Sequence, residues 1–146
     1  MAYFADLSPY HFLEMQSRAA LLNIGWLDTL RFRRGPTPPG LLERIAVATP
    51  LLRNPTRGIH ACEGCGGEHV TEVLAGDKVL LGMSEVWFPS PMDETVYIAP
   101  SLLFHYVRRH GYLPPEAFCE AVLALPLDPA EWDTPNGAFR QLVRRG

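Results

Sequence analysis

The spacing of hydrophobic positions in the first third of the chain predicts two helices. Ser8 is suited to a helix N-cap and Pro9 to the first helical position, and apolar residues then recur at roughly helical spacing as far as Leu21. Trp26 is expected to anchor the end of this helix against the core. After a loop rich in glycine and proline, a second helix is expected over residues 39–48.

The middle third is rich in β-forming residues and predicts a small antiparallel sheet. Residues 68–74 and 79–88 form two such runs, and the Ala-Gly-Asp-Lys sequence at 75–78 between them has the composition of a hairpin turn. Residues 94–99 are predicted to form a third strand.

The last third again predicts helices, which would flank this sheet. One begins at Pro100 and ends at Gly111, a residue type common just after a helix. A second is expected over residues 117–125, and a short last helix is expected from position 134 to Arg145.

Length and composition agree with one globular unit. The chain has 146 residues, of which 47% are hydrophobic and 20% charged, so it can bury a core without disulfides. No repeat or long linker divides it, and we predict one α+β zinc-binding domain over residues 1–146. The N-terminus lacks a secretory pattern and no apolar run approaches the roughly 20 residues of a membrane span, so a cytoplasmic protein is expected.

Charge is distributed unevenly along the chain. The net charge of −3 excludes a uniformly basic nucleic-acid binder. Between Arg31 and Arg57, however, six arginines accompany one glutamate, whereas residues 63–94 carry seven acids and one lysine. These stretches are expected to coat the surface or to face each other, and a basic surface for an anionic partner is the alternative.

The segment from His60 to His69 carries the strongest chemical signal. Cys62 and Cys65 form a Cys-x-x-Cys pair followed by glycines, which is typical of a zinc knuckle, because the tight turn brings two thiolates about one tetrahedral edge apart. An odd number of cysteines, two of them three positions apart, favours metal or redox chemistry over a structural disulfide.

A second pair of ligands is predicted on the helix after the strands. His105 and His110 have a His-x4-His spacing within the range that zinc fingers use. Residues five apart on an ideal helix lie about 140° apart around the axis, so both can reach one ion only if the last turn tightens or unwinds. His60 and His69 are the competing ligands.

Other interpretations of these residues remain open. The two cysteines are also consistent with an ordinary reduced pair or with a thioredoxin-like redox pair, although the neighbouring glycines disfavour the helix that redox chemistry needs. His105 is also consistent with a buried core histidine, and His110 with a favourable charge at a helix C-terminus. Cys119 is predicted to be a buried thiol on an apolar helix face.

A site built from two thiolates and two imidazoles would be structural, because it leaves no coordination position for water. A zinc hydrolase would require one of the four ligands to be replaced by water, with Glu63, Glu68 or Glu85 as the base. No His-Glu-x-x-His, Gly-x-Ser-x-Gly, P-loop or dinucleotide-binding motif appears in the chain, so an enzyme is not favoured.

Several motifs in sequence order resemble a family of small uncharacterised bacterial proteins, a domain of unknown function, over roughly residues 6–123. They are Leu-Asn-Ile-Gly-Trp-Leu-Asp at 22–28, His-Ala-Cys-Glu-Gly-Cys at 60–65, and His-Tyr-Val at 105–107 with His-Gly-Tyr-Leu-Pro-Pro at 110–115. The resemblance implies a bacterial cytoplasmic protein that carries both metal-ligand pairs, and it implies no activity.

The function expected from these features is a zinc-stabilised interaction or regulatory protein, including an immunity-type role, with an unidentified protein partner. Candidate aromatic contacts for that partner are Trp87, Phe88, Tyr112 and Trp132, although residues of this kind more often belong to the core. Nucleic-acid binding through the basic stretch from Arg31 to Arg57 is the alternative, and a zinc-dependent hydrolase is a further one. No membrane partner is expected.

Overall fold

The fold is α+β, as predicted. The structure is a computed structural model that describes residues 3–10, 15–17, 20–27, 31–50, 60–132 and 143–145, of which 15–17 and 143–145 are described by their backbone alone. In chain order the elements of these ranges are β1 (Met15–Ser17), β2 (Ala20–Asn23), α1 (Leu41–Ala48), the 3-10 turn η1 (Glu63–Cys65), β3 (Thr71–Leu74), β4 (Asp77–Leu80), β5 (Glu85–Pro89), β6 (Thr95–Pro100), α2 (Leu103–His110), α3 (Glu116–Leu123), the 3-10 turn η2 (Pro129–Glu131) and β7 (Val143–Arg145).

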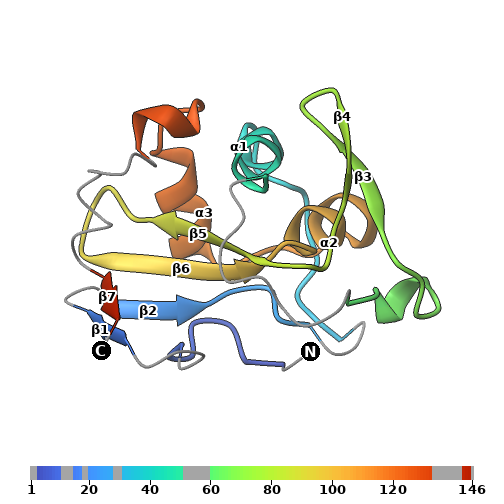
Figure 1. Ribbon diagram of the computed structural model, residues 1–146, viewed down its shortest axis with the longest axis horizontal. Helices are drawn as coiled ribbons and strands as arrows, with labels where there is room; N and C mark the ends of the chain where they lie inside the picture. The colour runs from blue at the N-terminus through green and yellow to red at the C-terminus, as the bar shows by residue number, and fades with distance from the viewer. Residues whose placement is uncertain are drawn as a thin grey trace.

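The central sheet has three strands in the order β2-β6-β5 (Figure 1). Strands β5 and β6 are antiparallel, with Trp87 opposite Ile98, whereas β2 runs parallel to β6, with Leu22 opposite Tyr97. Strands β3 and β4 form a separate antiparallel hairpin beside α2, and β1 pairs with β7. The sheets are therefore small, as predicted, but the central one is mixed.

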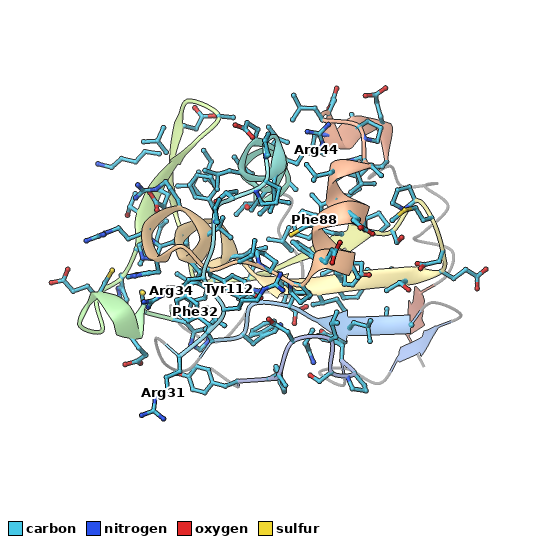
Figure 2. The ribbon with its side chains drawn as sticks, turned by 180° about the vertical axis from the view of Figure 1, so that it is seen from behind. Arg31, Phe32, Arg34, Arg44, Phe88 and Tyr112 are labelled. Carbon is cyan, nitrogen blue, oxygen red and sulfur yellow. The ribbon has the colours of Figure 1, made fainter. Side chains whose placement is uncertain are left out.

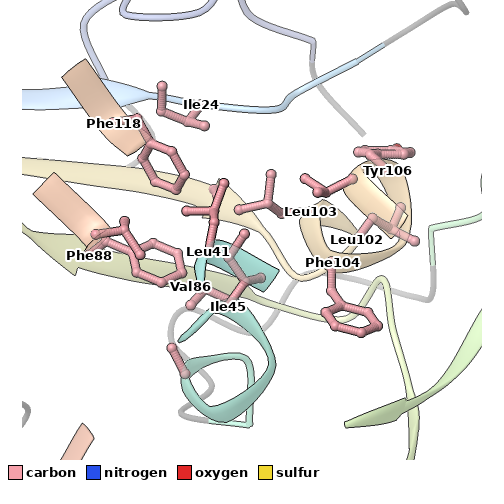
Figure 3. Packing of buried hydrophobic residues seen from close by; sticks show 14 of the residues in the cluster. Ile24, Leu41, Ile45, Val86, Phe88, Leu102, Leu103, Phe104, Tyr106 and Phe118 are labelled. Atoms are coloured by element: carbon pink, nitrogen blue, oxygen red, sulfur yellow. The ribbon is translucent and has the colours of Figure 1, made fainter. Parts of the chain in front are cut away.

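The main core lies between the central sheet and helices α1, α2 and α3 (Figure 3). Leu41 and Ile45 of α1 are fully buried, and Phe118 of α3 meets Phe88 and Tyr97 of the sheet edge-to-face, with ring centroids 5.4 and 5.5 Å apart. Full burial of one such side chain contributes about 1.5–3 kcal/mol, so this layer fixes the helices on the sheet.

The prediction of a helix that begins at Ser8 is wrong. The Ser8 hydroxyl donates to the carbonyl of Ala5 at 2.6 Å, and Pro9 forms an antiparallel bridge with Leu22. β2 then joins the sheet beside β6, more than 70 positions later. The Ser8-Pro9 pair resembles a helix start, but the local sequence carries no information about the distant strand β6. Pairing with that strand, and not the local helix pattern, therefore determines the structure here. Residues 11–14, 18 and 19 of the predicted helix lie outside the described residues.

A second, smaller core lies beneath the central sheet and contains Trp26 as expected. Its buried members are Tyr10, Trp26, Trp87, Val96 and Ile98. The indole nitrogen of Trp26 donates to the carbonyl of Ile98 at 3.0 Å, so this segment is hydrogen-bonded to β6 as well as packed against it.

The remaining predictions hold in most places. Helices α1, α2 and α3 and strand β6 lie close to their expected positions, and α2 ends at Gly111. The predicted run over residues 79–88 is split into β4 and β5 by residues 81–84. The prediction of a last helix is wrong at its C-terminal end, because Val143–Arg145 form strand β7. The start of that predicted helix lies outside the described residues.

No helix within the described ranges combines the length and the hydrophobicity that a membrane span requires.

Candidate metal centre

The Cys-x-x-Cys segment folds into a tight turn that places both thiols together. The amides of Cys65 and Gly67 both donate to the carbonyl of Cys62, at 3.1 and 3.0 Å. Gly66 and Gly67 have φ angles of 74° and 77°, a region in which residues with a Cβ are strained. The glycines after the second cysteine therefore let the chain reverse around the pair.

The two histidines come from α2, and the last turn of this helix is opened. The amides of Gly111 and Tyr112 both donate to the carbonyl of Tyr106, five and six positions earlier instead of the usual four. A wider last turn brings residues five apart closer to one side of the helix. This unwinding is one of the two possibilities that the His-x4-His spacing left open for His105 and His110.

The structure brings all four predicted ligands together. Their donor atoms, the Sγ atoms of Cys62 and Cys65 and a ring nitrogen of each of His105 and His110, lie within 4.8 Å of one another. The Cys62 Sγ is 3.4 Å from the His110 Nε2, and the Cys65 Sγ is 3.4 and 3.5 Å from the Nε2 atoms of His105 and His110.

These separations fit a tetrahedral ion. Zn–S and Zn–N bonds of about 2.3 and 2.05 Å at tetrahedral angles place sulfur and nitrogen about 3.6 Å apart. Three sulfur–nitrogen pairs of the structure lie 3.4–3.5 Å apart, close to that edge length, so the group can hold a metal ion.

The site lies at the border of the core. Cys62 and His105 are buried, with exposed fractions of 1% and 5%, whereas Cys65 and His110 are partly exposed. Burial raises the pKa of the Cys62 thiol, and the neighbouring Cys65 raises it further. Because burial disfavours a thiolate, a cation placed between the donors would offset that cost.

Two arginines, Arg34 and Arg109, lie close enough to His110 to affect its pKa. Burial lowers the pKa of His110, and nearby His105, Arg109 and Arg34 lower it further. Figure 2 shows Arg34 beside η1 with Phe32, and the Arg34 guanidinium carbon lies 4.8 Å from the Phe32 ring centroid. A neutral His110, with a free lone pair on one ring nitrogen, is therefore favoured.

A buried carboxylate supports the inner histidine. The His105 Nδ1 lies 3.0 Å from Oε2 of Glu72, and the Arg108 Nε donates to both oxygens of Glu72 at 2.9 Å. Sequence reasoning counted Glu72 only among the acidic residues. Exposed and buried residues alternate along β3, and Glu72 is buried between the exposed Thr71 and Val73. The Glu-Val-Leu sequence alone does not indicate that the glutamate is a buried residue.

The other sulfur and imidazole candidates lie outside this group. His60 is partly buried and its amide donates to the carbonyl of Gly82, and His69 is exposed. Neither belongs to the four-residue group that the described residues contain. All three cysteines are free thiols, and Cys119 is buried as predicted, with its Sγ 3.6 Å from the Pro114 carbonyl oxygen.

The carboxylates considered as a hydrolytic base are not members of the donor group. Glu63 and Glu68 are exposed on the cysteine turn. Glu85 is buried in the smaller core, where it accepts hydrogen bonds from the Tyr10 hydroxyl at 2.9 Å and the Trp87 indole nitrogen at 3.0 Å.

Part of the basic stretch is committed to internal contacts. Arg33 donates to the carbonyl of Pro114 at 3.0 Å, and Arg44 donates to that of Leu125 at 3.1 Å. Figure 2 shows Arg31 pointing away from the body of the protein. Arg53 and Arg57 lie outside the described residues, so nucleic-acid binding stays a prediction.

The aromatic residues proposed as partner contacts are largely internal. Trp87, Phe88 and Tyr112 have exposed fractions of 6%, 1% and 1%, and Trp132 is partly buried. The expectation that these residues form a contact surface is wrong for the first three, because their rings fill the two cores.

The chain was compared with known families, curated proteins and solved structures. A family model described as a domain of unknown function (DUF7919) matches residues 2–123, which confirms the resemblance drawn from the motifs. No curated protein and no solved structure matches significantly.

Proposed function

The chain belongs to the DUF7919 family of domains of unknown function, and we propose that it is a zinc-stabilised protein whose metal has a structural role. Cys62, Cys65, His105 and His110 are the proposed ligands. The observation that carries this proposal is the convergence of four donor atoms within 4.8 Å from two segments 40 positions apart.

The donor set favours zinc over other biological cations. Two thiolates and two imidazoles suit a borderline-soft ion, and calcium and magnesium prefer oxygen ligands. Zinc also has no redox chemistry and accepts tetrahedral geometry readily. The sulfur–nitrogen separations of 3.4–3.5 Å support the same assignment.

A non-catalytic role follows from the number of ligands. Four protein ligands fill a tetrahedral shell, so no position remains for an activated water. The nearby Glu63 and Glu68 are exposed and are not members of the donor group. A pocket of about 330 Å³ does lie beside the N-terminal segment, and none of the four donor residues lines it.

The zinc ion would join the cysteine turn and the β3–β4 hairpin to α2. Metal binding to such a site contributes directly to folding, because the unfolded chain has no preformed set of ligands. The hairpin forms a two-stranded sheet of its own, so the metal would supply a connection that sheet hydrogen bonds do not.

A closed metal site with four protein ligands offers no open coordination position for a substrate or a water. We therefore propose an interaction or regulatory role, with an immunity-type role as one form of it and a protein as the partner. A reducing bacterial cytoplasm is the proposed location, since the site requires free thiols. We also propose that residues 1–146 form one domain around the core that α1, α2 and α3 share with the sheet.

Metal analysis of the protein tests the zinc assignment. The protein would be purified without added metal or chelator, and its zinc content would be measured by elemental mass spectrometry. The number of reactive thiols would be counted with a thiol reagent. We expect one zinc ion per chain, with Cys62 and Cys65 protected from a thiol reagent until a chelator is added. A zinc content far below one per chain, with both thiols reacting freely, would contradict the proposal.

A further inference from the structure

A pair of contacts links the metal centre to a residue outside the four ligands. We propose that Glu72 is a positioning residue that fixes the tautomer and the orientation of His105, so that Nε2 of His105 is available to the metal. This inference rests on the proposed function, and it assigns a role to the β3 strand in metal affinity.

The tautomer follows from the hydrogen-bond chemistry of the pair. An ionised carboxylate only accepts hydrogen bonds, so the His105 Nδ1, 3.0 Å from Oε2 of Glu72, must carry the proton. In a neutral imidazole the other nitrogen then holds the lone pair. That nitrogen, Nε2, is the atom 3.4 Å from the Cys65 sulfur. The hydrogen bond and the metal position thus lie on opposite sides of one ring.

Burial makes this hydrogen bond selective. The side chains of His105 and Glu72 have exposed fractions of 7% and 8%. In a poorly hydrated site the opposite tautomer would direct a lone pair of Nδ1 at a carboxylate, and water would compensate for little of that repulsion. Carboxylate–histidine–metal arrangements use the same logic to orient the ligand.

Arg108 completes the arrangement by neutralising Glu72. Its Nε lies 2.9 Å from both carboxylate oxygens, and a terminal nitrogen lies 2.9 Å from Oε1. Arg108 follows His105 by three positions on α2, so the two side chains share one side of the helix. The guanidinium balances the charge of this buried carboxylate through charge-assisted hydrogen bonds.

The arrangement gives the hairpin a second attachment to α2. The cysteine turn would reach the helix through the metal, and β3 reaches the same helix through Glu72. Because His105 belongs to both connections, the affinity for metal depends on how β3 is seated against α2.

The test compares Glu72→Gln with Glu68→Gln, a matched control that removes an exposed carboxylate next to the cysteine turn. Zinc affinity would be measured by competition with a chromophoric chelator, and the His105 tautomer by nitrogen-15 NMR of the imidazole. We expect Glu72→Gln to weaken zinc binding about 10- to 100-fold. Glu68→Gln should keep wild-type affinity, and wild-type His105 should be protonated at Nδ1 with and without metal.

The outcomes separate this inference from the zinc assignment. A wild-type protein that binds no zinc would overturn both. One zinc per chain with equal affinity in the wild type and Glu72→Gln would overturn the role of Glu72 alone. If Glu72→Gln does not fold, the wild-type NMR measurement still decides, because protonation of His105 at Nε2 in the metal-free protein excludes the proposed positioning.

Discussion

The Sγ of Cys65 lies 3.4 Å from the Nε2 of His105, although the two residues are 40 positions apart in the sequence. The intervening chain contains the β3–β4 hairpin and strands β5 and β6. A metal ion bound at this point would stabilise the folded chain alone, because the unfolded chain has no preformed set of ligands. The contact therefore predicts that metal and stability are coupled.

Metal removal is expected to lower the thermal stability of the protein. Stabilisation by a ligand that binds only the folded state reaches about 4 kcal/mol when its free concentration is a thousandfold above the dissociation constant. Calorimetry with and without a strong chelator would measure the change, and zinc added back should restore the original melting temperature. A melting temperature that chelator does not alter would contradict the coupling.

Substitution of the cysteines is expected to separate a ligand from an ordinary buried thiol. Cys65→Ser removes one of the four donors and should abolish tight zinc binding. Cys119→Ser is the control, because this thiol is buried against the Pro114 carbonyl and lies outside the donor group. It should keep one zinc per chain and cost about 1 kcal/mol of stability. Equal zinc contents in the two variants would exclude Cys65 as a ligand.

The metal-free protein is expected to lose stability as the pH falls below about 6.5, the ordinary pKa of histidine. Burial and nearby positive charges lower the pKa of His110 in the folded state, so the unfolded chain takes up this proton first. Protonation then favours unfolding, and stability rises with pH across this window.

Urea unfolding at several pH values between about 5.5 and 7.5 would measure this slope. His110→Gln should flatten the slope in part, because burial also lowers the pKa of His60 and leaves a second contribution. A variant with the wild-type slope would show that His110 does not titrate as its surroundings imply.

The metal-binding pairs could be predicted from the sequence because each pair is local. A spacing of three positions between the cysteines and of five between the histidines are short-range patterns with a direct chemical meaning. Their convergence could be expected only by analogy with zinc sites, since nothing in the spacing defines how β3 and α2 pack. Glu72 was missed for the same reason: its inward orientation depends on that packing.

The N-terminal region shows the opposite case, in which a local pattern misled. The Ser8-Pro9 pair has the chemistry of a helix start, yet Pro9 bridges to Leu22 and β2 pairs with the distant β6. Parallel pairing between distant segments leaves no short-range sequence signature, whereas α2 combines a periodic apolar face with a terminal glycine.

Two glycines of the hairpin region allow the effect of backbone conformation to be separated from the effect of close contact. Gly82 and Gly76 have similar φ angles, 99° and 92°. A Cβ on Gly82 would overlap the carbonyl oxygen of His60, whereas nothing lies within 4 Å of a Cβ on Gly76. The Gly82 carbonyl also accepts the His60 amide at 2.9 Å, so this contact joins β4 and β5 to the start of the cysteine segment.

Gly76→Ala is therefore expected to cost about 1–2 kcal/mol from the left-handed backbone alone. Gly82→Ala should cost about 1–3 kcal/mol more, because the backbone around His60 must shift to remove the overlap. Chemical denaturation of both variants measures the two costs, and zinc affinity measured alongside reports whether the shift reaches Cys62. Equal destabilisation by the two substitutions would show that the approach of Gly82 to His60 is looser than the structure places it. A larger loss of stability for Gly82→Ala, accompanied by weaker zinc binding, would show that the backbone contact between Gly82 and His60 supports the cysteine turn.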